Sequence, residues 1–333
     1  MRKKGKAGKL FCIIIMACML AGCTGCQVAN TDIMVSNPLT ARQLFEIGGN
    51  ACGMKEAAVY LANYQNIYGT AYTIDLWQHD FGDESLTDFV KSVTLEELTR
   101  VYCMDLLAEV QEIALTEEEM SLVSQAAEEY YASLTADEQS YLDVSESDIE
   151  EYYTHYALAQ KLYNSLTDGV NEEVSDDEAR VMEIMQIFVI DSSAAAEVAE
   201  RLANGDDFAA VANIYNELPA IQVTISRDDI PDEVEEVAFQ LDNDAMSGMI
   251  PVEDGYYFIK CLNKYNEELT EANKSNIVEK REKEAFDDVY NAFVETLYSD
   301  LNEELWEELL PRLDGSIVTD SFFTVFEKYC RGI

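Results

Sequence analysis

The most informative stretches of this sequence are GDDFAAVA, residues 205–212, and DGYYFIKC, residues 254–261. In the first, Asp206-Asp207 precedes an apolar run, and aspartate is a preferred cap at the start of a helix. We therefore predict a short helix over Phe208–Tyr215. In the second, aromatic and β-branched residues over Tyr256–Leu262 predict a strand. The two stretches together indicate a domain that mixes helices and strands.

The segments around these two stretches complete a small α+β domain, which we place at residues 179–263. Hydrophobic patterning and Gly/Pro/Asn punctuation supply the remaining boundaries. The predicted elements are a strand at Met182–Ile190, a helix at Ala194–Ala203, a strand at Ile221–Ile225 and a helix at Asp232–Leu241.

The preceding residues, 41–178, read as a helical domain. A short strand is expected at Gln43–Ile47, and Thr167–Asp177 marks the domain boundary. Three Thr-x-x-Glu pairs have the spacing of capping boxes and predict helix starts: Thr94 with Glu97, Thr116 with Glu119, and Thr135 with Glu138. After Ser147, apolar residues recur every three or four positions and predict one buried helix face: Ile149, Tyr152, Tyr156, Ala159, Leu162 and Tyr163.

After the α+β domain, residues 264–333 are expected to return to the helical domain. A long amphipathic helix is predicted over Thr270–Leu310, followed by Pro311 and Gly315. The final stretch, Ser316–Tyr329, is rich in aromatic and β-branched residues and must be buried somewhere. We expect it to pack on the first helical domain. The fold class is therefore α+β: a discontinuous all-helical domain with a small α+β domain inserted.

The N-terminal residues have the pattern of an export signal. A basic stretch is followed by an apolar run from Leu10 to Leu20, which is shorter than the roughly 20 residues that a membrane helix needs. The sequence Leu20-Ala21-Gly22-Cys23 resembles the lipobox of bacterial lipoproteins. That resemblance implies cleavage after residue 22, lipid on Cys23, a tether over 23–40, and a position on the outer face of the cytoplasmic membrane. The alternative is an ordinary signal peptide with a chance cysteine.

The chain is strongly acidic, with a formal charge of −43. Residues 1–22 hold five basic and no acidic side chains, so the rest has 17 Lys and Arg against 65 Asp and Glu, a charge of −48. Such a field repels nucleic acids and anionic lipids, so we exclude nucleic-acid partners. The charge serves either solubility or the attraction of basic or unfolded chains.

Most catalytic and metal-binding motifs are missing from the sequence. The eight cysteines are scattered and form neither a disulfide framework nor a zinc pattern, and no phosphate-binding loop is present. The only histidines, His79 and His155, precede the α+β domain, so a hydrolytic triad there has no support. His79 is either a binding residue or a loop residue packed on Trp77, and His155 is expected to be structural. No cofactor and no metal are expected.

The α+β segment resembles parvulin-type peptidyl-prolyl isomerase domains. The likeness covers about Arg180–Leu262 and rests on EIMQIFV at 183–189, GDDFAAVA, the segment from Pro231 to Leu241, and DGYYFIKC. The surrounding layout is similar to extracytoplasmic foldases of the PrsA and SurA type. The stretch YQNIYGTAYTIDLWQHD, residues 64–80, resembles the N-terminal region of clostridial members.

The sequence departs from the parvulin pattern at its polar core. Gln186 and Tyr257 stand where the family usually has histidines. Glu217 and Leu218 lie where some members have cysteine or aspartate, and residues 219–223 replace a glycine-rich turn. Isomerisation breaks no covalent bond and needs no nucleophile, so Gln186 and Tyr257 could fill the catalytic positions through their hydrogen bonds. Alternatively, the two residues satisfy each other in a domain kept as a scaffold.

The resemblance also implies a substrate-binding pocket for proline, lined by Ile225, Ile230, Val234 and Phe239. All four residues could equally be core of a small domain, and for Phe239 we favour that interpretation. Two functions follow: a membrane-anchored foldase with isomerase activity, or a non-catalytic chaperone with a degenerate isomerase domain. A solute-binding lipoprotein is disfavoured, because the parallel-sheet pattern of two α/β lobes is missing. The expected partners are unfolded or nascent secreted polypeptides, and no oligomeric state is predicted.

Overall fold

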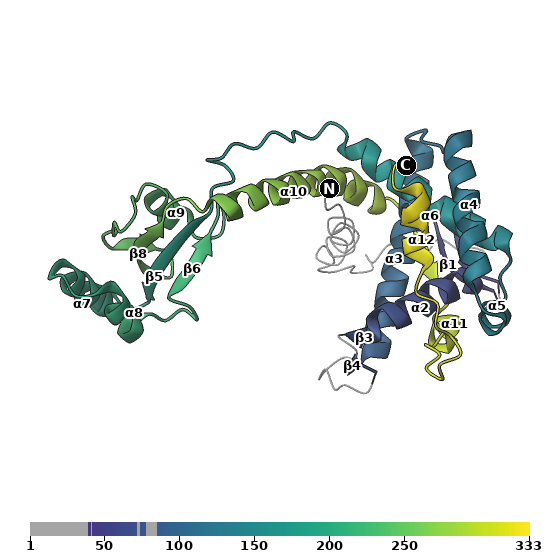
Figure 1. Cartoon of the computed structure of the whole chain (residues 1–333), viewed down its shortest axis with the longest axis horizontal. Helices are drawn as coiled ribbons and strands as arrows, with labels where there is room; N and C mark the ends of the chain where they lie inside the picture. Colours follow the sequence, from purple (N-terminus) through teal and green to yellow (C-terminus); the bar gives the residue numbers. More distant parts are fainter. Residues whose placement is uncertain (1–38, 41, 72–73, 78–84) are drawn as a thin grey trace, which may run out of the picture. The chain divides into compact units, whose positions relative to one another are not determined.

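The computed structural model describes residues 39–40, 42–71, 74–77 and 85–333 (Figure 1). The predictions for the export signal, Cys23 and His79 lie outside these residues, as does the predicted tether up to residue 38. Within them, no helix combines the length and the hydropathy needed to cross a membrane.

The described chain divides into two compact units. Unit 1 contains the residues up to Asp168 together with Ala285–Ile333, and unit 2 is Gly169–Glu284. Each unit has its own apolar core. The chain therefore has the predicted fold class, in which a small mixed domain interrupts a helical one.

Unit 1 is mainly helical, with a small sheet of antiparallel strands. Its helices are α2 Met54–Tyr68, α3 Leu86–Val110, α4 Glu117–Ser133, α5 Ala136–Leu142, α6 Glu146–Thr167, α11 Glu303–Glu308 and α12 Phe322–Cys330. Its strands are β1 Gln43–Ile47, β2 Asn50–Gly53 and β9 Ser299–Leu301, in the order β2-β1-β9, and the short pair β3 Thr70–Ala71 and β4 Ile74–Asp75. The predicted strand at Gln43–Ile47 is confirmed.

The last helix of the chain completes the core of unit 1. Phe322 is fully buried, and its ring stacks on Tyr153 with 4.4 Å between centroids. The Tyr153 hydroxyl donates to the Phe322 carbonyl over 2.6 Å, and the Phe322 amide donates to Asn63 Oδ1 over 3.0 Å. Figure 1 shows α12 beside α4 and α6. The predicted return of the C-terminal segment to the helical domain is confirmed.

Local signals located most helix starts correctly, but one of the three Thr-Glu pairs did not mark a start. Thr116 and Thr135 form capping boxes with Glu119 and Glu138, as predicted. Thr94 lies inside α3, where its hydroxyl donates to the Val90 carbonyl over 2.8 Å. A threonine can bond back to the carbonyl four residues earlier in a helix, so the Thr-x-x-Glu pattern also fits a helix interior.

Two further boundaries differ from prediction. The helix expected after Ser147 begins at Glu146, so it already includes Ser147, and Ser145 caps it in a capping box with Asp148. The helix expected over Thr270–Leu310 is α10, Glu267–Val294, and it ends well before Leu310. The following residues form β9, which pairs with β1, and then α11. This pairing joins residues far apart in the sequence, so no local pattern could reveal it.

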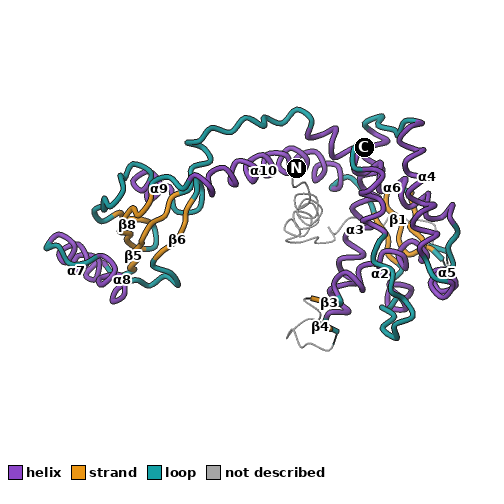
Figure 2. The backbone as a smooth tube through the Cα atoms, in the orientation of Figure 1, coloured by secondary structure: helices purple, strands orange, loops and turns teal. Residues whose placement is uncertain are grey.

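Unit 2 is a four-stranded antiparallel sheet covered by helices on both faces (Figure 2). Its strands are β5 Met182–Val189, β6 Gln222–Ile225, β7 Ile250–Val252 and β8 Gly255–Asn263, in the order β6-β5-β8-β7. Helices α7 Ser192–Ala203 and α8 Phe208–Tyr215 pack on one face, and α9 Asp232–Ala238 packs on the other. The predicted strands and helices are confirmed, with Asp207 capping α8. Strand β7 was not predicted.

Candidate active site

The six predicted site residues of unit 2 lie on one side of its sheet. Val234, at the centre of α9, and Phe239, directly after it, pack with Ile225 of β6 in one core cluster, and Ile230 and Tyr257 lie at the edge of that cluster. Gln186 shares this face, because its cross-strand partner on β8 is Ile259, a member of the same cluster. The strands and α9 thus bring together residues spread over more than seventy positions of the sequence.

Gln186 is a buried amide in the middle of β5. Only 7% of its surface is exposed, and its Nε2 donates to the Ala220 carbonyl over 3.1 Å. Its backbone amide donates to the Ile221 carbonyl over 2.8 Å. The Gln186 side chain therefore forms its hydrogen bond with the loop before β6 and not with Tyr257. This differs from the hypothesis that Gln186 and Tyr257 satisfy each other's hydrogen-bonding groups.

The loop that holds Gln186 is itself fixed by Asn216, a residue that the sequence analysis missed. Asn216 Oδ1 accepts from the Phe188 amide over 3.0 Å, and its Nδ2 donates to the Leu218 carbonyl over 2.9 Å. Glu217 adds a second link to β5, since its amide donates to the Phe188 carbonyl over 2.9 Å. The segment after α8 therefore serves as a support for Gln186. The only sequence signal for this role of Asn216 was its position directly after a predicted helix.

Tyr257 is a half-buried phenol on β8. It lies opposite Phe188, and the two rings are 4.8 Å apart between centroids. Burial raises the pKa of Tyr257 above its usual value, so the hydroxyl stays protonated at physiological pH. It can both donate and accept a hydrogen bond.

The apolar candidates differ in how far a ligand could reach them. Ile225 and Val234 are buried, whereas Ile230 is half-buried in the loop before α9. That loop is held by Asp229, whose carboxylate accepts from the Ser226 amide over 2.6 Å, and by Glu235, which accepts from the Asp228 amide over 2.8 Å. Ile230 is therefore the apolar candidate best placed for direct contact with a ligand.

Phe239 is covered by arginine side chains. The Arg227 and Arg180 guanidinium carbons lie 4.1 Å and 4.8 Å from its ring centroid. Arg180 also donates to the Phe239 carbonyl over 2.9 Å, and Arg227 pairs with Glu235 over 3.1 Å. These contacts agree with a structural role for Phe239.

The remaining histidine lies elsewhere. His155 is part of α6 in unit 1, beside the buried carboxylate of Glu56, so it has no part in the sheet of unit 2. The six candidate residues of this sheet face are therefore a neutral amide, a neutral phenol and four apolar side chains. These six can hold an uncharged ring and hydrogen-bond a backbone amide, but none of them is suited to proton transfer or nucleophilic attack near neutral pH. The same face also contains the buried thiol of Cys261, whose pKa is raised by burial.

Comparison with known proteins agrees with this geometry. Residues 144–274 match the family model described as the PPIC-type PPIase domain, and the whole sheet of unit 2 lies inside that range. The chain is similar to parvulin-type foldases of the PrsA type. PPIase here denotes peptidyl-prolyl cis-trans isomerase, and parvulin is the name of this domain class.

Two curated relatives are similar to this chain over a longer stretch than the isomerase-like segment. The foldase protein PrsA of Caldanaerobacter subterraneus is 28% identical over 230 residues, covering 60% of this chain and 68% of that protein. The foldase protein PrsA of Halalkalibacterium halodurans is 24% identical over 276 residues, covering 75% and 77%. A crystal structure of PrsA from Bacillus cereus is 20% identical with a TM-score of 0.40, covering 79% of this chain and 99% of that one.

Proposed function

We propose that this PrsA-type chain is held at the outer face of the cytoplasmic membrane by lipid on Cys23 and helps secreted polypeptides fold. Its parvulin domain would catalyse prolyl isomerisation at reduced efficiency. The observation that supports this most is the gathering of Gln186, Tyr257 and Ile230 on one face of the sheet over a buried apolar base of Ile225 and Val234.

The chemistry fits the residues present. The barrier to rotation about a peptide bond is roughly 18–20 kcal/mol and arises from amide resonance. A proline ring resting on Ile230 leaves the preceding carbonyl free to rotate, and the Tyr257 hydroxyl can stabilise the twisted amide by a hydrogen bond. Since neither Gln186 nor Tyr257 changes charge near neutral pH, the isomerase rate should show little pH dependence between about 6 and 8.

Reduced efficiency is inferred from the state of Gln186. Its amide nitrogen already donates to the Ala220 carbonyl, so less of its hydrogen-bonding capacity is left for a substrate. The same contact supports a second candidate function, a non-catalytic holdase whose parvulin domain is a scaffold. The covering of Phe239 by Arg180 and Arg227 also favours that candidate, because it closes one side of the apolar face.

A protease-coupled assay on a panel of Xaa-Pro peptides separates the two candidates. The soluble chain from Thr24 should accelerate isomerisation, and Ile230→Glu should remove the acceleration. Ile190→Glu is the matched control, because Ile190 is 62% exposed in the same unit and is not part of the core cluster that contains Ile225 and Val234. Two results would contradict the isomerase proposal. One is acceleration that persists in the Ile230→Glu variant, and the other is a folded protein that gives no acceleration at all. The Gln186→His/Tyr257→His variant then shows whether the usual polar pair restores activity.

Membrane attachment needs a separate test. Cells expressing the full chain are labelled with a radioactive fatty acid, and the same is done with Cys23→Ser. Label on the unaltered chain alone, with release of the variant from the membrane fraction, is the expected result. Equal membrane retention of both proteins would rule out Cys23 as the anchor.

A further inference from the structure

Acidic side chains border the candidate active site at one end of the sheet of unit 2. Strands β7 and β8 are joined by a two-residue turn, Glu253-Asp254, because Val252 pairs with Gly255. Both residues of the turn are exposed. Tyr257 lies three positions after Asp254, which is about 10 Å along the strand. The turn therefore lies at the same end of the sheet as the candidate phenol.

A third carboxylate lies at this end of the sheet, along the other edge of β5. The Glu217 amide donates to the Phe188 carbonyl over 2.9 Å, and Glu217 Oε1 accepts from the Ile190 amide over 3.1 Å. Phe188 in turn lies opposite Tyr257 of β8. The exposed Glu217 side chain is therefore held at the end of β5 nearest to Tyr257. We call Glu217, Glu253 and Asp254 the acidic rim.

The acidic rim has no cation of its own. Within the part of the chain that the structure describes, none of its three carboxylates forms an ion pair. The arginines of this sheet face are engaged elsewhere, since Arg180 and Arg227 both lie over the ring of Phe239. Lys260 of β8 lies on the opposite face, because its two neighbours along the strand belong to the cluster under α9. The rim therefore presents an uncompensated negative charge.

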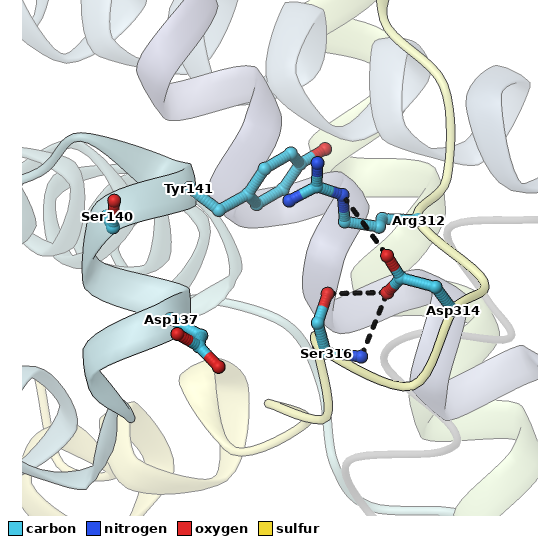
Figure 3. Close-up of a pocket in the computed structure, with 6 residues that line it drawn as sticks. All are labelled: Asp137, Ser140, Tyr141, Arg312, Asp314 and Ser316. Carbon is cyan, nitrogen blue, oxygen red and sulfur yellow. Dashed lines mark hydrogen bonds and ion pairs between the residues drawn. The ribbon is translucent and has the colours of Figure 1, made fainter.

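A polar cavity in unit 1 shows the contrasting arrangement, in which a carboxylate is paired from within the fold. The cavity has a volume of about 480 Å³ and is lined by Asp137, Ser140, Tyr141, Arg312, Asp314 and Ser316 (Figure 3). Arg312 Nε lies 3.8 Å from Asp314 Oδ2, and the Ser316 amide donates to Asp314 Oδ1 over 2.9 Å. Asp314 therefore already has a cation and a donor, whereas the acidic rim is left for a cation from outside the chain.

A buried hydrogen-bond acceptor on the same sheet face also lacks a donor. Gln186 is 7% exposed, and its Nε2 donates to the Ala220 carbonyl, but its Oε1 accepts no hydrogen bond from any residue that the structure describes. This oxygen can accept from a backbone N–H of a ligand. Gln186 and Phe188 lie two positions apart on β5, hence on one face and about 7 Å apart. A peptide bound at Gln186 Oε1 would therefore place a neighbouring side chain beside Phe188 and the acidic rim.

We propose that the candidate active site favours prolyl bonds preceded by lysine or arginine, and that the acidic rim determines this preference. With the proline ring on Ile230 and the preceding carbonyl at Tyr257, the side chain of the preceding residue extends toward the rim. A long cationic side chain is attracted by the three carboxylates, whereas glutamate or aspartate in its place is repelled. This inference rests on the proposed isomerase function for the position of the ring, and it adds the class of substrate.

Peptides that differ only in the residue before proline test this proposal on the soluble chain from Thr24. The probes are Ala-Xaa-Pro-Phe p-nitroanilides with lysine, arginine, alanine or glutamate as Xaa, used in the protease-coupled assay. The kcat/KM should be about five- to tenfold higher for the lysine peptide than for the glutamate peptide, with alanine between them. The difference should shrink as salt is raised, because exposed charges are screened. Equal kcat/KM for the lysine and glutamate peptides would overturn the proposal.

Variants then assign the preference to the acidic rim. Glu253→Gln/Asp254→Asn should lower the lysine-to-glutamate ratio about twofold or more and leave the rate on the alanine peptide unchanged. Adding Glu217→Gln, which keeps an oxygen for the Ile190 amide, should remove most of the remaining difference. The matched control is Glu267→Gln/Glu268→Gln, because both residues are exposed in unit 2 and follow the far end of β8. An equal loss of discrimination in the control would overturn the assignment to the rim.

Binding of the same peptides separates failure of this proposal from failure of the isomerase proposal. An NMR titration that follows the backbone amide signals of Gly255 and Tyr257 gives an affinity for each peptide. Equal acceleration of all the peptides would sustain the isomerase proposal and overturn the preference.

A folded chain that accelerates none of the peptides would overturn catalysis, and the affinities then decide the preference. Tighter binding of the lysine peptide than of the glutamate peptide, lost in the rim variants, would sustain it. Equal affinities would overturn it as well.

Discussion

The imidazole Nδ1 of His155 lies 3.5 Å from Glu56 Oε1 in the core of unit 1, where Glu56 is only 2% exposed. Other polar groups surround the pair. The Tyr102 hydroxyl donates to Glu56 Oε2 over 2.6 Å, Cys52 Sγ lies 3.6 Å from the same oxygen, and His155 Nε2 lies 4.0 Å from Asp105 Oδ2. One histidine on α6 therefore connects a carboxylate on α2 with one on α3.

This cluster predicts that the stability of unit 1 depends on pH. Burial lowers the pKa of His155, but the Glu56 carboxylate beside it and the charges of Asp105 and Glu151 outweigh this effect, so the pKa is raised above its usual value. Such a histidine stabilises the fold below its unfolded pKa, and the contribution is lost as pH rises through the folded pKa. Burial also raises the pKa of Asp105, to about 7, so this carboxyl contributes a further loss of stability as pH rises from its unfolded pKa, about 4, to about 7. We expect the free energy of unfolding of unit 1 to fall as pH rises from about 4 through neutral pH.

Substitution of His155 separates this effect from the general repulsion of an acidic chain. His155→Gln should cost about 1–3 kcal/mol near pH 6 and less near pH 8, measured by urea unfolding. Glu128→Gln is the control, because Glu128 is an exposed carboxylate on α4 and is not among the charges that raise the pKa of His155. A His155→Gln cost that is the same at every pH would mean that the imidazole is not protonated in the folded chain.

Gly255 predicts a sharp requirement for glycine in the DGYYFIKC stretch. A Cβ atom there would lie 2.5 Å from the Val189 carbonyl oxygen and 2.8 Å from the Phe188 ring, and the backbone oxygen cannot move aside. Gly255→Ala should therefore destabilise unit 2 by about 2 kcal/mol or more. Gly248→Ala is the matched control, since nothing lies within 4 Å of its Cβ position, and it should be neutral or slightly stabilising. Similar unfolding free energies for the two variants would contradict the prediction.

Asn216 is predicted to position Gln186 without contacting a substrate. Asn216→Ala removes the acceptor for the Phe188 amide and the link to the Leu218 carbonyl, so it should cost about 1–2 kcal/mol. Hydrogen exchange of the Phe188 amide should become faster, and the side-chain amide signals of Gln186 should shift. Asn213→Ala, which removes one exposed contact to the Ala209 carbonyl within α8, should change neither signal. An unchanged Gln186 signal in Asn216→Ala would remove the positioning role.

Phe322 is predicted to hold the two sequence segments of unit 1 together. Its ring contacts Tyr60, Tyr130 and Tyr153 with centroid distances of 5.2 Å, 5.1 Å and 4.4 Å. Phe322→Ala should cost about 3–5 kcal/mol and lower the unfolding temperature of unit 1. Phe323→Ala, at the half-buried neighbouring position, should cost less. Equal losses for the two variants would show that the depth of burial at α12 is not what stabilises the unit.

Short-range features of this fold could be predicted because their physical causes are local. The starts of α4 and α5 follow from Thr116 and Thr135, whose hydroxyls accept from backbone amides three residues later. Helix α8 coincides with its predicted range, Phe208–Tyr215, because Asp207 caps it and an apolar run follows. The fold class and the parvulin likeness also came from such stretches.

Pairing between strands that lie far apart in the sequence could not be predicted from local patterns. Strand β9 exists because it covers the free edge of β1, some 250 residues earlier in the chain, and its own sequence was read as part of a helix. Strand β7 is short and gains its backbone partners from β8. The amphipathic pattern predicted α10 but not where it ends. Residues 299–301 pair with β1, which lies far away in the sequence, so a local pattern could not show that the helix stops before them.

The sequence by itself determined the acidic charge, the inserted α+β domain, and the absence of histidine from that domain. Only the tertiary structure decided what those side chains contact. Gln186 bonds to Ala220 and not to Tyr257, and His155 meets Glu56 and Asp105. The reason is physical: a buried polar group must find its partner among whatever groups the packing brings within about 3 Å, and packing is settled by the whole chain.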